Sequence, residues 1–366
     1  MADARISRWY PGVVPRRQFL ALPPLLPLLG GCAPRLPPLP LRLSARHPKI
    51  GVHTRLTDEV EPAKIRKTLD MVVAMGASWI VEYFPWAYVE STPGAYEWGH
   101  ADLVVNAALE RGLTLVARVD LVPDWARPAN TTARYLDRAG YPTYARFLAV
   151  FARRYRGKIG YLQVWNEPNT SFEWGYLPPD PASYAAMLQT VYPVLKAANP
   201  AMQVVSAGLA ANLATGGIAM NDLTYLDALY AAGAAPYFDV LGAHAYGDIQ
   251  PATAPPASQE LNFQRVLLHR ASMLRHGDSA KTVLITEAGW NDAPRWTHAV
   301  SPAARINNTL QAYRLAETWP WLLALCMWEF RLPDRTGTAQ DYSTFVAKDF
   351  TPRAIYDAVA AYARGT

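Results

Sequence analysis

The sequence contains little cysteine: its 366 residues include two, Cys32 and Cys326. That number excludes the cysteine-rich frameworks that hold small exported domains together with several disulfides. A chain of this length does not need cross-links, because it can bury a large core. The apolar content of 51% supplies such a core, so we expect a globular protein stabilised mainly by packing.

Charge is also scarce. Charged residues make up 18% of the chain, and no run of lysine and arginine typical of nucleic-acid-binding proteins occurs. Much of the net charge of +5 lies at the start, where Arg5, Arg8, Arg16 and Arg17 against Asp3 give +3 and leave +2 for the remainder. We therefore expect no nucleic-acid partner and no partner selected by charge.

The spacing of histidines gives no sign of a metal site. None of the seven histidines stands in a His-x-His or His-Glu-x-x-His pattern, in which both side chains share one face and can bind the same ion. A metal-dependent hydrolase is therefore a minor alternative, and we expect neither a metal nor a cofactor. The histidines are His47, His53, His100, His244, His269, His276 and His298.

Residues 1–32 have the pattern of an export signal. Residues 15–20 (PRRQFL) resemble a twin-arginine motif, and the apolar residues 21–29 follow. Residues 29–32 (LGGC) resemble a bacterial lipoprotein box, in which Cys32 carries the lipid. A plain signal peptide with an incidental cysteine and a short anchor helix are the alternatives. Three prolines disfavour the helix, and the apolar run is too short to span a bilayer.

These features divide the chain into three parts. After the signal, the proline-rich residues 33–48 are expected to form a semi-rigid, extended tether, and residues 49–366 to form one folded domain. We expect export by the twin-arginine pathway to the cell surface or periplasm, or otherwise secretion. The membrane contact would then be limited to a lipid on Cys32, which leaves Cys326 without a disulfide partner.

From Lys49 onward, short apolar runs alternate with longer helical patterns. Eight such units in about 320 residues, without a second compositional block, predict a (β/α)8 TIM barrel. An open doubly wound sheet is the rival, but it usually carries a glycine-rich turn after its first strand, where Gly51 stands alone here. The expected strands are residues 50–53, 79–83, 113–119, 161–165, 203–207, 238–244, 282–286 and 323–328, and the expected helices are 62–75, 101–111, 141–155, 181–198, 223–232, 258–276, 303–318 and 352–363.

Two of the expected strands end on a glutamate. Glu167 follows an apolar run and precedes Pro168, which cannot donate a ladder hydrogen bond and must stop the strand. Glu287 ends a second apolar run, just before Gly289. Glutamate is depleted in strands and is rarely buried without a partner. Two carboxylates at the catalytic end of a barrel are the minimal equipment for glycoside hydrolysis.

Other expected strand ends also carry polar side chains, where barrel enzymes place their chemistry. A single such residue is usually a satisfied structural group. Five further strand ends with polar groups are harder to explain in that way. The residues are His53, Glu82, Arg118 with Asp120, His244 with Tyr246, and Trp328 with Glu329.

With these motifs in place, residues 50–350 resemble the retaining glycoside hydrolases of clan A. The resemblance is strongest to family 39 and to the neighbouring family 5 cellulase-like enzymes. Its motifs occur in order and on the expected strands. They are residues 165–169 (WNEPN), residues 286–290 (TEAGW), the segment from Phe84 to Glu90 with residues 93–98 (PGAYEW) and Asp102, and residues 123–125 (PDW).

The resemblance implies a role for each matching residue. Glu167 would be the general acid/base and Glu287 the nucleophile. Carboxyl groups about 5–5.5 Å apart leave no room for a water and give retention through a covalent intermediate. Asn166 would bind the 2-hydroxyl of the sugar, and Tyr246, paired with His244 on the sixth strand, would hold the nucleophile.

The remaining expected substrate contacts are less specific. Trp328 would be a platform for a sugar ring, and His53 and Arg118 would provide polar contacts. Six tryptophans, Trp290 and Trp86 among them, fall in loops or strand ends on the catalytic side, where they either bind sugar faces or cap the core. The other four are Trp125, Trp174, Trp296 and Trp328.

The sequence leaves several functions open. A carbohydrate-binding barrel without catalysis and a transglycosylase would share these residues. Residues 169–180 and 246–259 are expected to form cleft walls, but the sequence does not distinguish an open groove from a closed pocket. We expect an extracellular or cell-wall poly- or oligosaccharide as the substrate; the sugar and the linkage are left open.

Overall fold

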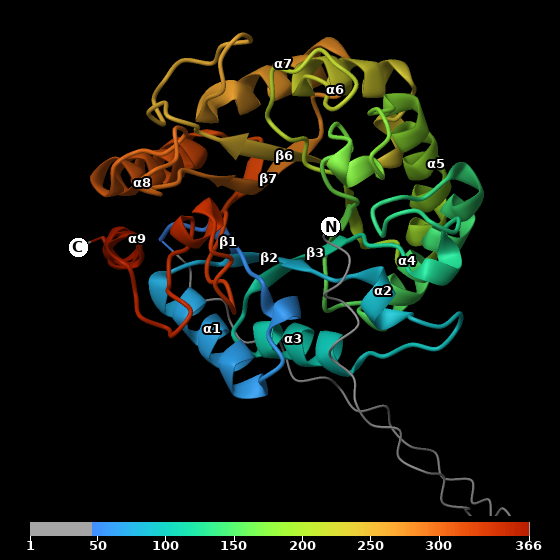
Figure 1. Ribbon diagram of the computed structural model, residues 1–366, viewed down its shortest axis with the longest axis horizontal. Helices are drawn as coiled ribbons and strands as arrows, with labels where there is room; N and C mark the ends of the chain where they lie inside the picture. The colour runs from blue at the N-terminus through green and yellow to red at the C-terminus, as the bar shows by residue number, and fades with distance from the viewer. Residues whose placement is uncertain (1–45, 366) are drawn as a thin grey trace, which may run out of the picture. The chain divides into compact units, whose positions relative to one another are not determined.

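The structure is a computed structural model that describes residues 46–365. The export signal, Cys32 and most of the tether lie outside the described residues. Within residues 46–365, eight parallel strands form a closed barrel in sequential order, with the last strand paired to the first (Figure 1). They are β1 (Ile50–His53), β2 (Trp79–Tyr83), β3 (Thr114–Val119), β4 (Tyr161–Val164), β5 (Gln203–Val205), β6 (Val240–Tyr246), β7 (Thr282–Gly289) and β8 (Leu322–Met327).

Helices surround the strands, as Figure 1 shows, and confirm the predicted (β/α)8 barrel. None of the helices between residues 46 and 365 is long and apolar enough to cross a membrane. The main helices are α1 (Pro62–Met75), α3 (Gly99–Glu110), α4 (Tyr141–Arg154), α5 (Pro181–Ala198), α6 (Asp222–Ala231), α7 (Val266–Arg275), α8 (Pro302–Thr318) and α9 (Ala354–Arg364), and a single turn, α2 (Trp86–Val89), follows β2.

The helix ends follow local chemistry. Pro62 begins α1, where a missing N–H costs nothing, and Gly76 ends it in the left-handed region at φ 95°. The side chains of Asp180, Asn221 and Ser301 accept hydrogen bonds from the first-turn amides of α5, α6 and α8. These signals explain why α1 and α5 begin and end where the sequence predicts.

Most element boundaries lie within two residues of the prediction, and two elements, α7 and β7, differ by more. Helix α7 begins at Val266 instead of residue 258, because residues 258–262 form an irregular segment whose carbonyls accept hydrogen bonds from the buried Arg265. Strand β7 continues to Gly289, three residues past the predicted end, because β6 also extends to Tyr246 and pairs with it. Glu287 therefore lies within a strand.

The interior of the barrel is filled by a small apolar cluster. Gly51 lies on β1 where a Cβ atom would stand 2.6 Å from Sγ of Cys326, so the close approach of β1 and β8 requires glycine. A larger core lies between the strands and the helices. The interior cluster consists of Trp79, Val81, Val116, Val205, Val240, Leu284, Ala324 and Cys326.

The register between β6 and β7 shifts by one residue. Ala243 pairs with Ile285, but the next residue, His244, pairs with Glu287. Because side chains alternate along a strand and Leu284 packs inside the barrel, strict alternation would place Thr286 inside next. The extra residue reverses the alternation and brings Glu287 opposite His244.

The two ends of the described chain meet at the outside of the barrel. Nη1 of Arg46 donates a hydrogen bond to the carbonyl oxygen of Arg364 at 3.3 Å. His47 stacks on Tyr362 of α9, with ring centroids 4.2 Å apart. The last helix is thereby fastened beside the first strand.

Candidate active site

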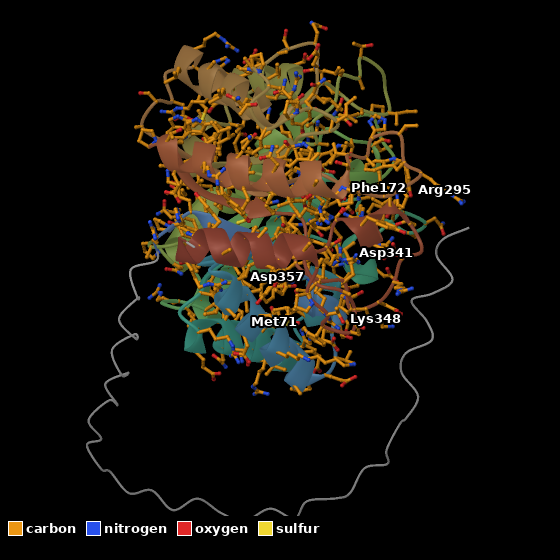
Figure 2. The ribbon with its side chains drawn as sticks, turned by 90° about the vertical axis from the view of Figure 1, so that its left-hand side faces the viewer. Met71, Phe172, Arg295, Asp341, Lys348 and Asp357 are labelled. Atoms are coloured by element: carbon orange, nitrogen blue, oxygen red, sulfur yellow. The ribbon has the colours of Figure 1, made fainter. Side chains whose placement is uncertain are left out.

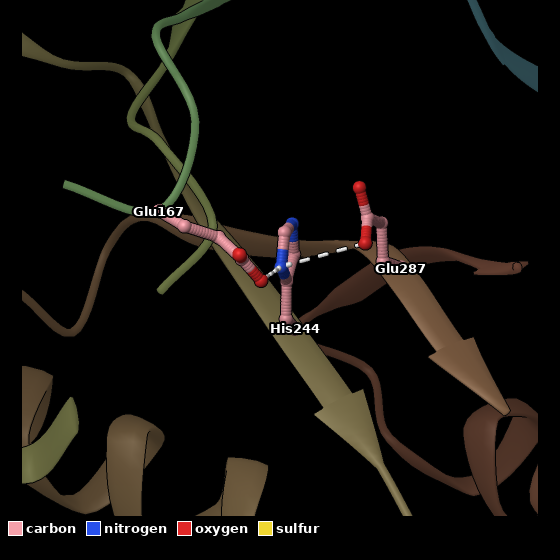
Figure 3. Close-up of side chains that lie close together, drawn as sticks. All are labelled: Glu167, His244 and Glu287. Atoms are coloured by element: carbon pink, nitrogen blue, oxygen red, sulfur yellow. Dashed lines mark hydrogen bonds and ion pairs between the residues drawn. The ribbon is translucent and has the colours of Figure 1, made fainter. Parts of the chain in front are cut away.

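Glu167, His244 and Glu287 meet at the carboxyl ends of β4, β6 and β7 (Figure 3). Nδ1 of His244 lies 2.7 Å from Oε1 of Glu167 and 3.7 Å from Oε2 of Glu287. One oxygen of each carboxyl group and this nitrogen all lie within 4.8 Å of one another. The two glutamates predicted from the sequence are thus brought together, with His244 between them.

The backbone around Glu167 is forced into an unusual conformation. Trp165 and Glu167 have φ angles of 70° and 38°, in the region that side chains with a Cβ atom rarely occupy. Such residues cost on the order of 1–3 kcal/mol each and persist where surrounding contacts hold them. The amide of Glu167 donates to the carbonyl of Gly208, and Gln163 donates to the carbonyl of Trp165. These bonds hold the turn that presents the carboxyl group.

Two donors fix the carboxylate of Glu287. Nη1 of Arg118 donates to Oε1 at 3.1 Å, and the hydroxyl of Tyr246 donates to Oε2 at 2.7 Å. Burial raises the pKa of Tyr246 well above its usual value, so its hydroxyl stays protonated. Each oxygen of the carboxyl group therefore has its own donor, which fixes the orientation of the side chain.

Arg118 is itself held in place. Its Nε donates to Asp120 at 3.0 Å, and its guanidinium lies 4.8 Å from the ring centroid of Tyr83. Burial alone would lower the pKa of Arg118, but the negative charges of Asp120 and Glu287 outweigh it and raise that pKa. Arg118 therefore remains a fixed cation beside Glu287.

Glu167 and His244 form a hydrogen-bonded pair. Burial raises the pKa of Glu167, but the hydrogen bond and charge of His244 outweigh it and lower the net value. Burial lowers the pKa of His244, whereas the charge of Glu287 and the hydrogen bond to Glu167 raise it above its usual value. Both shifts favour the ion pair of the two groups, in which Nδ1 of His244 donates to Oε1 of Glu167 at 2.7 Å.

His53 provides an acceptor at the end of β1. Its Nδ1 lies 2.8 Å from the carbonyl oxygen of Thr54, which can only accept, so Nδ1 carries the hydrogen. Burial lowers the pKa of His53 to about 3, and the ring is neutral. Its Nε2 is therefore an unprotonated acceptor, and it is buried without a partner. The ring contacts Trp328 edge-on, with centroids 4.6 Å apart.

A further group at this edge is Glu329, for which the sequence predicted a polar group at the end of a strand and no particular role. The side chain is fully buried, and both of its carboxyl oxygens lack a partner. Burial raises the pKa of Glu329 to about 8; the charge of Arg55 opposes this rise, and that of Glu287 adds to it. A carboxylic acid that keeps its proton at neutral pH thus lies close enough to Glu287 to interact with it electrostatically.

Beside the carboxyl groups lies a cavity of about 680 Å³. Tyr246 lines it and also contacts Glu287, which joins the cavity to the reactive centre. The predicted contacts Trp290 and Trp328 line it too, and the indole of Trp290 is fixed by a hydrogen bond to the carbonyl of Gln250. A volume of this size is typical of small-molecule sites.

Trp86 requires a correction. It is fully buried and packs against Trp125, Tyr144 and Phe147, so it is a core residue and does not line the cavity. Its indole donates to the buried Glu90 and ties α2 together. The expected packing role for some of the tryptophans therefore applies here.

Asn166 lies directly before Glu167 and is nearly buried, with its Oδ1 unpartnered. The cluster of Glu167, His244 and Glu287 could ligate a cation only if His244 released the proton that it shares with Glu167. Nothing else in the donor set favours a metal, because the oxygens of Glu287 already accept from Arg118 and Tyr246.

The fold and the site together define a class: a (β/α)8 barrel with one carboxylate at the end of the fourth strand and another at the end of the seventh. No model of a known protein family matches the sequence, and no curated protein matches it. Solved structures do resemble this chain.

One is a family 39 glycoside hydrolase from Bacteroides cellulosilyticus WH2, with a TM-score of 0.66 and 23% identity over 86% of this chain. The chain spans 62% of the length of that protein. GH5_18 from Bifidobacterium longum subsp. longum has a TM-score of 0.65 and 13% identity, covering 87% of this chain and 79% of its own.

GH5_18 from Streptomyces cattleya, solved with GlcNAc, has a TM-score of 0.62 and 18% identity, covering 88% of this chain and 80% of its own. At these identities the likeness concerns the fold. The resemblance to clan A barrels inferred from the sequence is confirmed at that level.

Proposed function

We propose that this protein is a retaining glycoside hydrolase that cleaves O-glycosidic bonds of a poly- or oligosaccharide. The observation that carries the proposal is that one carboxyl oxygen of Glu167 and one of Glu287 lie within 4.8 Å of each other, with His244 beside both. Carboxyl groups this close exclude the water that an inverting enzyme holds between them, for which about 6.5–9.5 Å is needed. The glycoside hydrolase folds among the similar structures support the same reaction class.

In the first step Glu287 attacks the anomeric carbon, and the bond to the leaving oxygen breaks. Arg118 and Tyr246 each donate to one oxygen of the carboxylate and thereby aim it. A covalent ester forms between Glu287 and the sugar, and the electron pair of the broken bond moves to the leaving oxygen.

The leaving oxygen takes a proton from Glu167. In the free protein that proton lies on Nδ1 of His244, 2.7 Å from Glu167, so a short transfer to Oε1 produces the neutral acid. When the substrate displaces water, the charged Glu167–His244 pair is disfavoured relative to the neutral pair, so the proton moves from Nδ1 of His244 to Glu167.

In the second step a water attacks the glycosyl ester. Esterification removes the negative charge of Glu287, and Glu167 then accepts the proton of the water as a general base. The product leaves with its original anomeric configuration, and Glu287 is ionised again. A transglycosylase would differ only in that a sugar hydroxyl replaces water in this step.

The test is product release by residues 46–366 from a panel of β-glucans, xylans, mannans and β-glycosyl fluorides. We expect the first-formed sugar to keep its anomeric configuration, as followed by NMR. Glu287→Ala and Glu167→Gln should each lower kcat by about 100-fold or more, the range of nucleophilic and acid–base contributions.

Glu110→Gln is the matched control, because Glu110 is an exposed glutamate on α3. A Glu167→Ala variant should be accelerated by azide, which needs no base and yields a glycosyl azide of retained configuration. Inverted product, or full activity in Glu167→Gln, would refute the mechanism. Glycan binding without cleavage by the wild type would favour the carbohydrate-binding barrel instead.

The cellular location is a separate proposal, supported by the sequence. We propose export through the twin-arginine pathway and a lipid on Cys32. Membrane fractionation of a Cys32→Ser chain tests it: the variant should become soluble, and unchanged membrane association would exclude the lipid.

A further inference from the structure

Apolar side chains gather on the exposed loops that follow β4 and β5. Five of them have exposed fractions between 39% and 80%, although exposed apolar groups on a soluble domain are usually scattered. Figure 2 places Phe172 at the same end of the barrel as Asp341, which follows β8. We name this surface the rim patch; it consists of Phe172, Tyr176, Leu177, Leu213 and Ile218.

The loops that carry the rim patch are firmly ordered. The fully buried Asn169 donates to the carbonyls of Ala210 and Met220 and accepts from the amide of Ala210. The amide of Ser171 donates to the carbonyl of Ile218 at 2.7 Å, which joins the two loops. The patch is therefore a built surface and does not depend on folding of the loops around a ligand.

Within the patch, two aromatic rings stand side by side. The centroids of Phe172 and Tyr176 are 5.9 Å apart, and the rings are 53% and 64% exposed. Tyr176 has a φ of 62°, a left-handed conformation that costs about 1 kcal/mol or more for a residue with a Cβ atom. The fold thus accepts strain at the residue that presents the second ring to solvent.

Arg134 connects the patch with the reactive centre. Its guanidinium lies 5.0 Å from the ring centroid of Phe172. The loop that carries Phe172 begins beside the acid, where the amide of Thr170 donates to the carbonyl of Glu167 at 2.9 Å, and the charge of Arg134 lowers the pKa of Glu167. Arg134 is also ion-paired with Glu173, so the two charges beside the patch compensate each other. The surface next to Glu167 is therefore apolar and aromatic without a net charge.

We propose that the rim patch binds the leaving-group side of a neutral glycan, with Phe172 and Tyr176 as stacking platforms for the sugar units beyond the cleaved bond. The inference rests on the proposed function, because an acid that protonates the leaving oxygen must have the leaving sugar on its own side of the site. Aromatic faces match the C–H faces of pyranose rings, and the compensated charge of Arg134 favours no ionic group. The substrate is then a chain that continues past the cleavage point.

The experiment compares two substrates of the same sugar. A β-glycosyl fluoride has a leaving group without a ring, whereas β-linked hexasaccharides of glucose, xylose or mannose place rings over the patch. For Phe172→Ala and Tyr176→Ala we expect kcat/KM on the cleaved hexasaccharide to fall about tenfold each, with the fluoride rate unchanged within twofold. Phe172→Tyr should restore hexasaccharide cleavage, and Leu274→Ala, an exposed leucine on α7, should change neither.

If Phe172→Ala and Tyr176→Ala lowered kcat/KM equally on both substrates, or did not lower it on the hexasaccharide, the proposal would be overturned. Binding is measured separately with Glu287→Ala and the three hexasaccharides by calorimetry. Patch-dependent binding supports the subsite even if the wild type cleaves nothing, in which case only the hydrolase assignment fails. Patch-dependent sedimentation with phosphatidylcholine vesicles, without glycan binding, would assign the surface to a membrane and contradict the proposal.

Discussion

At the scale of single residues, the site contains a third carboxyl group that the proposed reaction does not use. Glu167 and Glu287 suffice for both steps, yet Glu329 lies buried nearby with a pKa of about 8 and no partner for either oxygen. An acid whose folded-state pKa is raised keeps its proton on folding. Its unfolded form releases that proton above a pKa of about 4.5, so the folded state loses stability as the pH rises from there to about 8.

Glu329→Gln removes this pH dependence while keeping the shape of the side chain. The free energy of unfolding of the variant minus that of the parent should increase by about 3 kcal/mol between pH 5 and pH 8. This value follows from 1.36 kcal/mol per pKa unit. Urea unfolding at both pH values measures it, with Glu110→Gln as the exposed control. Parallel stability curves for variant and parent would show that Glu329 is ionised in the folded protein.

The site residues that could be predicted from the sequence are polar side chains that stand in apolar segments. Glu167, His244 and Arg118 are polar groups at the ends of apolar strands; in the structure Glu167 contacts His244, and Arg118 contacts Glu287. Trp86 was predicted as a substrate contact but is buried in the core. An indole ring can serve as a platform for a sugar or as a core side chain, and its position in the sequence does not distinguish these two roles. The state of Glu329 depends on three-dimensional burial, which no local pattern reports.

At the scale of elements, α1 and α5 were predicted to the residue because proline, glycine and aspartate mark their ends. The register shift between β6 and β7 was not predictable. The residues between Thr282 and Thr286 are all apolar, so the sequence does not show which of them face the interior of the barrel. The extra residue becomes apparent only from the pairing of β7 with β6. The start of α7 was missed for a related reason, since a buried arginine replaces the usual capping signal there.

That arginine gives an element-scale prediction. Arg265 donates through Nε and Nη2 to the fully buried Asp222 and through Nη1 to the carbonyls of Ala257 and Ser258. Burial alone would raise the pKa of Asp222, but His269 and Arg265 outweigh it and lower that pKa to about 2. The pair therefore joins α6, α7 and the loop before α7.

Arg265→Met should cost about 3–5 kcal/mol of stability, because it leaves a buried carboxylate with only His269 as partner. Arg265→Lys keeps the positive charge but not the several N–H donors of the guanidinium, and it should lower the free energy of unfolding by less. Urea unfolding measures both, and hydrogen exchange should show faster opening of residues 257–262. A loss below about 1 kcal/mol in Arg265→Met would mean that the ion pair does not hold this loop.

At the scale of the whole molecule, the sequence predicted the barrel because the count of strand–helix units is a global property that errors at single boundaries do not change. It did not predict how the ring closes. Closure depends on Gly51, where β1 meets Cys326 of β8, and on the anchoring of α9 near Arg46. Those contacts join residues about 270 to 320 positions apart, beyond the reach of any local signal.

The meeting of Arg46 with Arg364 has a consequence for the order of the chain. A short glycine–serine linker can join these ends, and new ends can be opened at Gly157, in the turn between α4 and β4 on the face opposite the site. We expect this circular permutant to show the near-ultraviolet circular dichroism of the parent, and a molten spectrum would contradict it. The contacts between adjacent strand–helix units then specify this fold, whichever unit comes first in the chain.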